Sequence, residues 1–325
     1  MPVNLKGRHL LSMLHHTPQE IRFLLDLSRD LKQLKRAGTY PRNLEHRNIA
    51  LLFEKPSTRT RCAFVVACVD EGAHPEYLGK SDLQLGKKET IADTARVLGR
   101  MFDGLQFRGF AHSTVEMLAR HAGVPVWNGL TDLFHPTQAL ADLMTIEEKL
   151  GRLAGVRLTY LGDGRNNVSN SLLVAGAKMG MEVRIVAPEA LWPEGELLAQ
   201  VRRIAEETSA SIVITSSVEE GVDGADVLYT DVWASMGEEA KAAERIVLLT
   251  PYRVDSRMIQ LTGNPRVIFL HCLPAIHNTD TDASRETGAQ EVTEEVFEGP
   301  HSQVFDQAEN RLHTIKAVMV ASLGR

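Results

Sequence analysis

The chain has little cysteine and few aromatic residues, and it lacks long apolar or basic runs. Its 325 residues include only three cysteines, Cys62, Cys68 and Cys272, and 6% are aromatic. The cysteines form no Cys-x-x-Cys pair and no cluster typical of a metal site, so no bound metal is expected. A reduced, cytoplasmic protein is the simplest interpretation of so few scattered thiols.

The chain also lacks the segments that mark membrane, secreted or nucleic-acid-binding proteins. No apolar run approaches the roughly 18 residues that cross a membrane. Residues 1–8 contain no apolar signal-peptide core. The net charge is -6 and no Lys/Arg-rich segment stands out, which argues against nucleic acid as a partner. We therefore expect neither membrane nor nucleic-acid binding.

What the chain does have is length and a regular alternation of segments. With 325 residues, 43% of them hydrophobic, it can build two α/β domains, each with its own core. Strand-like and helix-like segments alternate, which predicts parallel sheets with crossover helices. The expected strands are 48–53, 75–78, 104–107, 124–127, 156–161, 182–187, 211–215, 225–230 and 266–271. The expected helices are 58–70, 89–101, 113–121, 136–149, 167–179, 194–207, 238–244, 255–261 and 303–322.

A glycine-bounded stretch, Gly151-Arg152-Leu153-Ala154-Gly155, interrupts the alternation and marks the predicted domain boundary. We expect an α/β fold with a first domain over 1–150 and a second over 151–302, each a mostly parallel sheet flanked by helices. The C-terminal helix, 303–325, is expected to pack back onto the first domain. Polar clusters follow many of the predicted strands, and ligands bind beyond the carboxyl ends of parallel strands. We therefore expect the active site in a cleft between the domains.

The cluster after the first strand is the most informative. Ser57-Thr58-Arg59-Thr60-Arg61 places three hydroxyls and two guanidiniums at a predicted helix start. Unpaired backbone N–H groups and the positive end of the helix dipole attract an anion there. Arginine adds forked donors that fit phosphate oxygens. A phosphorylated small molecule is the favoured ligand, although the same residues also suit a plain capped helix start.

Two further clusters suit such a ligand. Arg108 ends a predicted buried strand, where a charge is costly unless it is paired or faces a cleft. A structural ion pair and a ligand contact are both compatible with that position. In His135-Pro136-Thr137-Gln138, Pro136 fits the first turn of a helix. Either the motif only caps that helix, or its imidazole, hydroxyl and amide hold a carbonyl group and its amide partner.

The second half adds three clusters after predicted strands. Gly162-Asp163-Gly164-Arg165-Asn166-Asn167 only weakly matches a dinucleotide fingerprint, because Asn167 stands where the third glycine belongs, so NAD is not expected. Asp231 ends a strand, where it can cap a loop or accept an ammonium group. In His271-Cys272-Leu273-Pro274, His271 points away from Cys272 along an extended chain, which disfavours a nucleophilic cysteine.

Together these motifs resemble the aspartate/ornithine transcarbamylase family over nearly the whole chain. The resemblance also includes Phe53-Glu54-Lys55, residues 93–101, Phe107-Arg108-Gly109 and Ala308-Glu309-Asn310-Arg311. The Ser-Thr-Arg-Thr-Arg and His-Pro-Thr-Gln motifs imply carbamoyl phosphate as one substrate. The Asp-Val-Trp-x-Ser-Met-Gly motif at 231–237, together with His-Cys-Leu-Pro, implies ornithine rather than aspartate as the other.

The resemblance also implies which residues form the site. Those expected to bind carbamoyl phosphate are Ser57, Thr58, Arg59, Thr60, Gln84, Arg108, His135, Pro136, Thr137, Gln138, Cys272, Leu273 and Arg311. Those expected to bind ornithine are Asn167, Asp231, Ser235 and Met236. Those expected to take part in catalysis are Arg59, Thr60, Arg108, His135, Gln138, Asp231 and Cys272. Gln84 lies in a loop, 81–89, that contacts a neighbouring site in the family, although Leu83 and Lys87 depart from the usual residues there.

The implied reaction is direct attack of the δ-amine of L-ornithine on carbamoyl phosphate, giving L-citrulline and phosphate. It needs no cofactor, no metal and no covalent enzyme intermediate. The family further implies a homotrimer, or a multiple of trimers, with sites at subunit interfaces. Three alternatives remain open: a carbamoyltransferase for putrescine or an acylated ornithine, a non-catalytic ornithine or phosphate sensor, and a nucleotide-binding oxidoreductase. Arginine synthesis and breakdown would use the same site.

Overall fold

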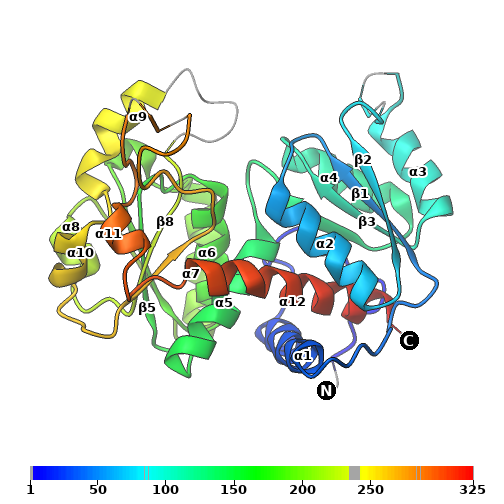
Figure 1. Ribbon diagram of the computed structural model, residues 1–325, viewed down its shortest axis with the longest axis horizontal. Coiled ribbons are helices and arrows are strands. Elements are labelled where there is room, and N and C mark those ends of the chain that lie inside the picture. The colour runs from blue at the N-terminus through cyan, green and yellow to red at the C-terminus, as the bar shows by residue number, and fades with distance from the viewer. Residues whose placement is uncertain are drawn as a thin grey trace. The chain divides into compact units, whose positions relative to one another are not determined.

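The computed structural model describes residues 3–83, 85–86, 88–233, 242–282, 284–285 and 287–324. The chain divides into two compact units (Figure 1). Unit 1 comprises Met1–Met144 and Glu309–Arg325, and unit 2 comprises Thr145–Ala308. Among the described residues, no helix is both long enough and apolar enough to cross a membrane.

Unit 1 is built on four parallel strands in the order β2-β1-β3-β4. Its strands are β1 (Asn48–Phe53), β2 (His74–Gly79), β3 (Gly104–Arg108) and β4 (Val126–Leu130). Its helices are α1 (Pro18–Arg36), α2 (Thr58–Asp70), α3 (Ile91–Met101) and α4 (His112–Ala122), with the first part of α5 (Pro136–Leu150) and most of α12 (Val304–Leu323). Both faces of the sheet are covered, which explains why β1 is an almost unbroken apolar run.

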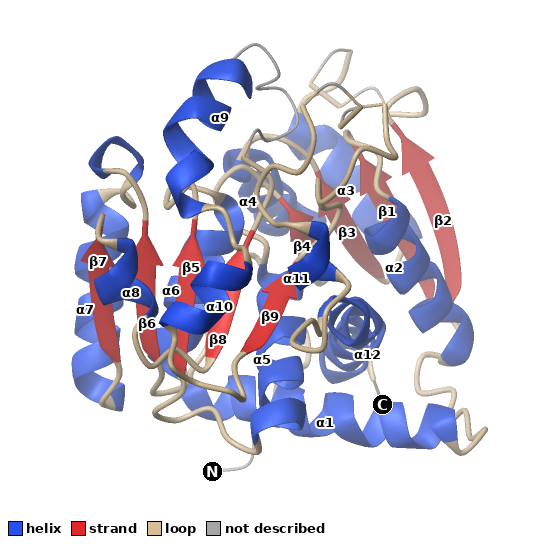
Figure 2. Cartoon of the chain, turned by 60° about the vertical axis from the view of Figure 1, so that its left-hand side comes forward, coloured by secondary structure: helices blue, strands red, loops and turns tan. Residues whose placement is uncertain are grey.

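Unit 2 has five parallel strands in the order β7-β6-β5-β8-β9 (Figure 2). Its strands are β5 (Arg157–Leu161), β6 (Glu182–Val186), β7 (Ser211–Thr215), β8 (Val227–Thr230) and β9 (Ile268–His271). Its helices include α6 (Asn167–Lys178), α7 (Gly195–Thr208), α8 (Val218–Val222), α9 (Ala242–Leu249), α10 (Ser256–Leu261) and α11 (Glu294–Phe297), and η1 (Glu189–Leu191) and η3 (Thr250–Tyr252) are short 3-10 turns.

The strand order places a topological switch point in each unit. In unit 1 the chain runs from β1 to β2 on one side and then to β3 on the other. In unit 2 it runs from β5 outward to β7 and then returns to β8 on the other side of β5. Loops that leave the carboxyl ends of two such strands diverge and create a binding crevice. The sites of interest are therefore the ends of β1 and β3 in unit 1 and of β5 and β8 in unit 2.

The predicted α/β class with parallel sheets is confirmed, and each expected strand is found with ends within three residues of the prediction. The sequence analysis missed α1, although Thr17 and Glu20 form a capping box and Pro18 occupies the first helical position. It also missed the short helices α8 and α11. The expected helix 238–244 lies partly outside the described residues, and α9 is described from Ala242 onward.

The buried histidine His313 of α12 makes the folded state sensitive to acid. Its side chain is 2% exposed and lies 3.3 Å from the Glu309 carboxylate. Burial, only partly offset by that carboxylate, lowers the pKa of His313 to about 4. As the pH falls below about 6.5, the unfolded chain therefore takes up this proton before the folded one does. The stability contributed by the neutral ring is complete above pH 6.5 and declines as the pH approaches 4.

We predict that His313→Gln removes this part of the acid sensitivity. Urea unfolding at pH 7 and at pH 4.5 should show a pH-dependent loss of unfolding free energy that is smaller by about 2 kcal/mol in the variant than in the wild type. Titrating groups that do not contact His313 are common to both proteins and cancel in the comparison, whereas the Glu309 carboxylate loses its bond to His313 in the variant. Equal losses in the two proteins would contradict the assignment.

Candidate active site

The start of α2 forms the first wall of the site in unit 1. Ser57 caps the helix: its backbone is extended and its hydroxyl accepts a hydrogen bond from the backbone N–H of Thr60 at 3.2 Å. The N–H groups of the first helical residues, Thr58 and Arg59, have no acceptor within the helix and point beyond its end. With the positive end of the helix dipole, they form an anion-binding corner. The corner directly follows β1, at the switch point.

Thr60 joins this corner to two buried arginines. Its side chain is fully buried, and its hydroxyl oxygen accepts from Arg108 Nη1 at 3.3 Å and from Arg311 Nη2 at 3.0 Å. Arg108 ends β3 and pairs in register with Phe53, the last residue of β1. Arg311 comes from α12, some 200 residues further along the chain. One hydroxyl thus fixes two guanidiniums beside the anion-binding corner.

The start of α5 supplies the polar residues expected from the sequence. His135 is 4% exposed, and its Nδ1 lies 3.3 Å from the Thr137 hydroxyl. Pro136 is the first residue of the helix. Gln138 accepts from Arg311 Nη1 through its Oε1 at 3.0 Å and donates through Nε2 to Asp142 Oδ1 at 2.8 Å. These two bonds fix the orientation of the Gln138 amide, with its oxygen on the arginine side.

The positive charge of this pocket acts on His135. Burial of the ring, followed by repulsion from Arg311, Arg108 and Arg59, holds the pKa of His135 well below its usual value. The imidazole is therefore neutral at physiological pH and acts as a hydrogen-bonding group rather than as a cation. The positive charge available to a ligand comes from the three arginines and the helix end.

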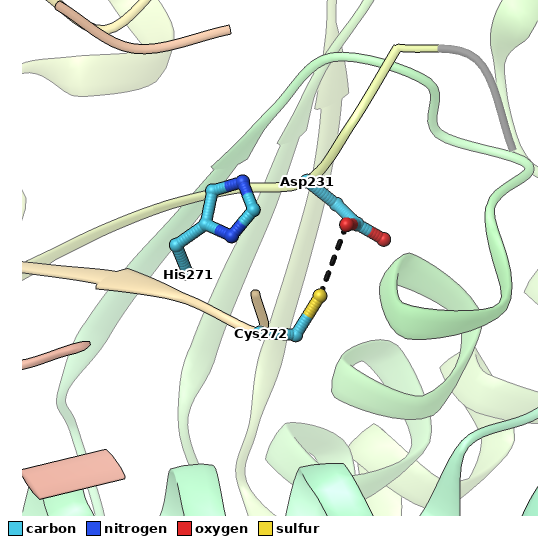
Figure 3. A group of neighbouring side chains, drawn as sticks. All are labelled: Asp231, His271 and Cys272. Atoms are coloured by element: carbon cyan, nitrogen blue, oxygen red, sulfur yellow. Dashed lines mark hydrogen bonds between the residues drawn. The ribbon is translucent and has the colours of Figure 1, made fainter. Parts of the chain in front are cut away.

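The second set of residues surrounds Asp231, which follows β8 in unit 2. The carboxylate is 7% exposed and accepts three hydrogen bonds. Asn166 Nδ2 donates to Oδ2 at 2.9 Å, and the backbone N–H of Val232 donates to Oδ1 at 2.8 Å. The Cys272 thiol also donates to Oδ1, at 2.9 Å (Figure 3). Asn166 also caps α6 by accepting from the backbone N–H of Val168. These contacts fix the carboxylate at the switch point of unit 2.

His271 and Glu291 hold the loop that carries Cys272. Both side chains are fully buried, and His271 Nε2 lies 3.2 Å from Glu291 Oε1. His271 Nδ1 accepts from the backbone N–H of Leu273 at 2.9 Å, so Nε2 carries the proton. Glu291 Oε1 also accepts from the backbone N–H of Ile276 at 2.7 Å. Leu273 adopts a left-handed φ of 59°, a conformation that these bonds help to hold.

The side chains of Asp231, His271 and Cys272 offer ligand atoms within 4.8 Å of one another (Figure 3). Such a group has the composition of a metal site. However, both ring nitrogens of His271 already have partners, and the Cys272 thiol is a donor to Asp231. In the structure, these hydrogen bonds hold the loop after β9 in place next to Asp231.

The predicted site residues that can be placed fall into two groups. In unit 1 the structure joins Thr60, Arg108, Gln138 and Arg311 directly, with His135 in their field and Ser57, Thr58 and Arg59 at the adjoining corner. In unit 2 it joins Asp231 and Cys272, and Asn167 begins α6 next to Asn166. The expected residues Gln84, Ser235 and Met236 lie outside the described residues.

Three residues that were given no site role from the sequence contact the expected ones: Asn166, which lies in the motif at 162–167, Asp142 and Glu291. Asn166 contacts Asp231, and it could have been found as the capping residue in front of an apolar helical run. Asp142 lies one helical turn after Gln138, a spacing that places the two on one face. Glu291 contacts His271 across 20 positions of chain, and no local pattern marks it.

The fold and these residues define a two-unit α/β protein with an anion pocket in one unit and a buried carboxylate in the other. Residues 8–148 match "Aspartate/ornithine carbamoyltransferase, carbamoyl-P binding domain", and residues 154–322 match "Aspartate/ornithine carbamoyltransferase, Asp/Orn binding domain". The chain belongs to the aspartate/ornithine carbamoyltransferase family.

Named relatives are similar over nearly their whole length. A Bacillus licheniformis protein named "Ornithine carbamoyltransferase, catabolic" is 60% identical over 99% of this chain and 98% of its own. The Streptococcus suis "Ornithine carbamoyltransferase" is 57% identical over 98% of this chain and 96% of its own. The solved ornithine carbamoyltransferase from Pyrococcus furiosus is 44% identical, with a TM-score of 0.93 and 99% of both chains covered.

We predict that His135 does not titrate near neutral pH. Because burial and three arginines lower its pKa, its ring resonances in an NMR titration should stay constant from pH 8 to pH 6. The His135→Gln variant identifies which resonances belong to this ring. A titration midpoint for His135 at or above 6.5 would contradict the account of a positively charged pocket.

Proposed function

We propose that this protein transfers the carbamoyl group of carbamoyl phosphate to the δ-amine of L-ornithine, giving L-citrulline and phosphate. The observation that carries the proposal is the Thr60 hydroxyl holding Arg108 and Arg311 beside the start of α2. Membership of the family and the names of its close relatives support the same reaction. The reaction proceeds by direct attack and needs no cofactor and no covalent enzyme intermediate.

The start of α2 binds the phosphate group. Backbone N–H groups at the helix end, the Ser57 and Thr58 hydroxyls and the Arg59 guanidinium surround its oxygens. As the bond to the carbonyl carbon breaks, negative charge grows on the leaving phosphate. Positive groups already in place stabilise that charge without having to reorganise.

The carbonyl group lies against Thr60, Arg108 and His135. The Thr60 oxygen already accepts from two guanidiniums, so its own O–H is directed away from them and donates to the carbonyl oxygen. The neutral His135 adds a further N–H donor. Gln138 accepts from the carbamoyl NH₂ through the oxygen that its bond to Asp142 orients. These donors face the oxygen on which negative charge develops during attack.

Ornithine binds through the residues of unit 2. Asp231 accepts from the α-ammonium group, and Asn167, Ser235 and Met236 complete the amino-acid site. Asp231 keeps its position because Asn166 and the Cys272 thiol bond both of its oxygens. Cys272 and Leu273 position the reactive end of the substrate rather than forming a covalent bond to it.

The attacking δ-amine must be neutral, although a free alkylamine has a pKa near 10.4. Desolvation and the arginines of the carbamoyl phosphate pocket favour the uncharged form. The nitrogen lone pair then bonds to the carbonyl carbon, and the carbon–oxygen bond to phosphate breaks. The departing phosphate accepts the proton that the nitrogen releases, so atoms and charge balance without a protein base.

The direct test is citrulline formation by the purified protein from carbamoyl phosphate and L-ornithine, with putrescine and N-acetylornithine in parallel. We predict citrulline with ornithine and little product with the other amines. Product with another amine alone would keep the carbamoyl phosphate half of the proposal and overturn the assignment of Asp231. No product with any amine, despite carbamoyl phosphate binding, would indicate a sensor.

Two substitutions separate the substrates. Arg311→Met should raise KM for carbamoyl phosphate at least tenfold, because it removes a charged donor from the pocket. Asp231→Asn should raise KM for ornithine by a similar factor and leave carbamoyl phosphate binding close to normal. Effects of the same size on both substrates in both variants would contradict the division of roles.

We further propose a homo-oligomer, a trimer or a multiple of trimers, that acts in the cytoplasm and has its sites at subunit interfaces. Three free thiols suit a reducing compartment. An apolar stripe along the outer face of α2 supports self-association: Cys62 is exposed, Val66 is 38% exposed and Val69 is 64% exposed. These residues follow helical spacing and face away from the sheet of their own unit. In such an assembly, Gln84 would reach a neighbouring site.

Val69→Glu should weaken this assembly, because a carboxylate at an apolar interface loses its hydration without gaining a partner. Sedimentation velocity should show a shift toward monomer, and activity should fall with it. Val247→Glu, on the exposed face of α9 where Val247 is 79% exposed, is the matched control and should change neither property. An unaltered sedimentation coefficient for Val69→Glu would argue against this interface.

A further inference from the structure

Helix α1 carries a buried lysine, Lys32, that has no part in the proposed reaction. Lys32 is 5% exposed and lies on the buried face of α1 with Ile21, Leu25 and Ser28. Burying an ammonium group costs free energy, and apolar side chains of similar volume usually stabilise a core at least as well. A buried lysine at this position therefore calls for a reason other than stability alone.

The Lys32 ammonium reaches the residue just before Arg311. Its Nζ donates to Asn310 Oδ1 at 2.7 Å, and Asn310 is fully buried in α12. Successive residues of a helix lie only about 1.5 Å apart along its axis, so a bond at Asn310 fixes the height and rotation of the turn that carries Arg311. Both views show α1 crossing next to α12, since each helix is seen lengthwise in the view where the other is seen nearly end-on (Figure 1, Figure 2).

A second buried contact holds the same helix further along. Asp70, the last residue of α2, accepts from Lys316 Nζ at 2.7 Å and from Lys35 Nζ at 2.6 Å. Lys316 lies on α12 and Lys35 on α1, so one carboxylate joins three helices. The two lysines draw the pKa of Asp70 below its usual range against the effect of burial, which keeps the carboxylate charged.

Along α12, Arg311 lies between the Asn310 contact and the Lys316 contact, and its guanidinium makes two hydrogen bonds that depend on the position of the helix. Nη1 must meet Gln138 Oε1 and Nη2 must meet Thr60 Oγ1, both at 3.0 Å. A shift of α12 by a fraction of a turn would break one bond or the other. Misplacement of a binding group by about 1 Å can cost two orders of magnitude in rate.

We infer that Lys32 is a positioning residue for the carbamoyl phosphate pocket: through Asn310, it sets the turn of α12 that aims Arg311 at Thr60 and Gln138. The inference rests on the proposed function for the identity of the ligand. The geometric claim concerns only Arg311 and its two partners. Helix α1 contributes to the site through this contact, and Asp70 with its two lysines prevents α12 from sliding.

The test uses Lys32→Met, which keeps the aliphatic stem and removes the ammonium group. We expect KM for carbamoyl phosphate, and the Kd for inorganic phosphate measured by calorimetry, to rise about tenfold. KM for ornithine should stay within twofold of the wild type. Lys32→Arg retains a cationic donor and should restore most of the affinity.

The same two helices supply a matched control. Arg36 and Glu309 also join α1 to α12, at 3.4 Å, but their side chains are 64% and 41% exposed. An exposed pair of this kind contributes little to the free energy of folding or to position. Arg36→Ala should therefore leave the phosphate Kd and both KM values unchanged.

A double-mutant cycle separates positioning from general destabilisation. If Lys32 acts through Arg311, adding Lys32→Met to Arg311→Met should cause no further loss of phosphate affinity. Additive losses, an equal rise in both KM values, or an unchanged phosphate Kd in Lys32→Met would each overturn the inference. If Lys32→Met does not fold, Asn310→Ser removes the other partner of the contact and is judged by the same measurements.

Failure of the inference and failure of the proposed function are distinguishable. If the wild type makes citrulline but Lys32→Met binds phosphate normally, the inference is wrong and the function stands. If the wild type makes no citrulline, the proposed function is wrong. The phosphate titrations then still decide whether Lys32 acts on the pocket.

Discussion

The hydroxyl of Thr60 holds two guanidinium groups at once, and the arrangement of unit 1 depends on that contact. Arg108 arrives from β3 and Arg311 from α12, and both meet Thr60 one turn into α2. Like charges this close repel one another, and their field adds to burial of the ring in holding the pKa of His135 well below its usual value. A bound anion relieves the repulsion. In the proposed function, the free energy spent in bringing the cations together is recovered when the phosphate group binds, which is electrostatic preorganisation.

In the proposed function unit 2 meets the opposite requirement, since it must keep one carboxylate in place for the ammonium group of ornithine. Three uncharged donors hold the Asp231 carboxylate: the Asn166 amide, the backbone N–H of Val232 and the Cys272 thiol. The buried His271–Glu291 pair then holds the loop that brings Cys272 to the carboxylate. The two units thus carry their charged clusters at the same position, the switch point of a parallel sheet, and the proposed function assigns ligands of opposite charge to them.

The strands and the polar clusters that follow them could be predicted from the sequence, because each is marked by a pattern of neighbouring residues. Alternating apolar runs located the strands. Hydroxyl and arginine clusters after them indicated which residues the structure joins around Thr60, because parallel topology brings strand ends together. Residues whose role depends on distant partners could not be predicted in this way. Glu291 and Lys32 carry no local signal, since each acts across a contact formed only on folding. The helix α1 was predictable from its capping box at Thr17, yet its contact with Asn310 through Lys32 was not.

The central claim is that the pocket around Thr60 is already arranged for carbamoyl phosphate. The most direct measurement is a crystal structure with phosphonoacetamide, in which a CH₂ group replaces the bridging oxygen of carbamoyl phosphate. The account predicts phosphonate oxygens within hydrogen-bonding distance, about 2.7–3.2 Å, of Arg59 and the first N–H groups of α2. The carbonyl oxygen should lie on Thr60, with the contacts to Arg108 and Arg311 intact. A phosphonate bound elsewhere, or a pocket in which those two contacts are broken, would contradict it.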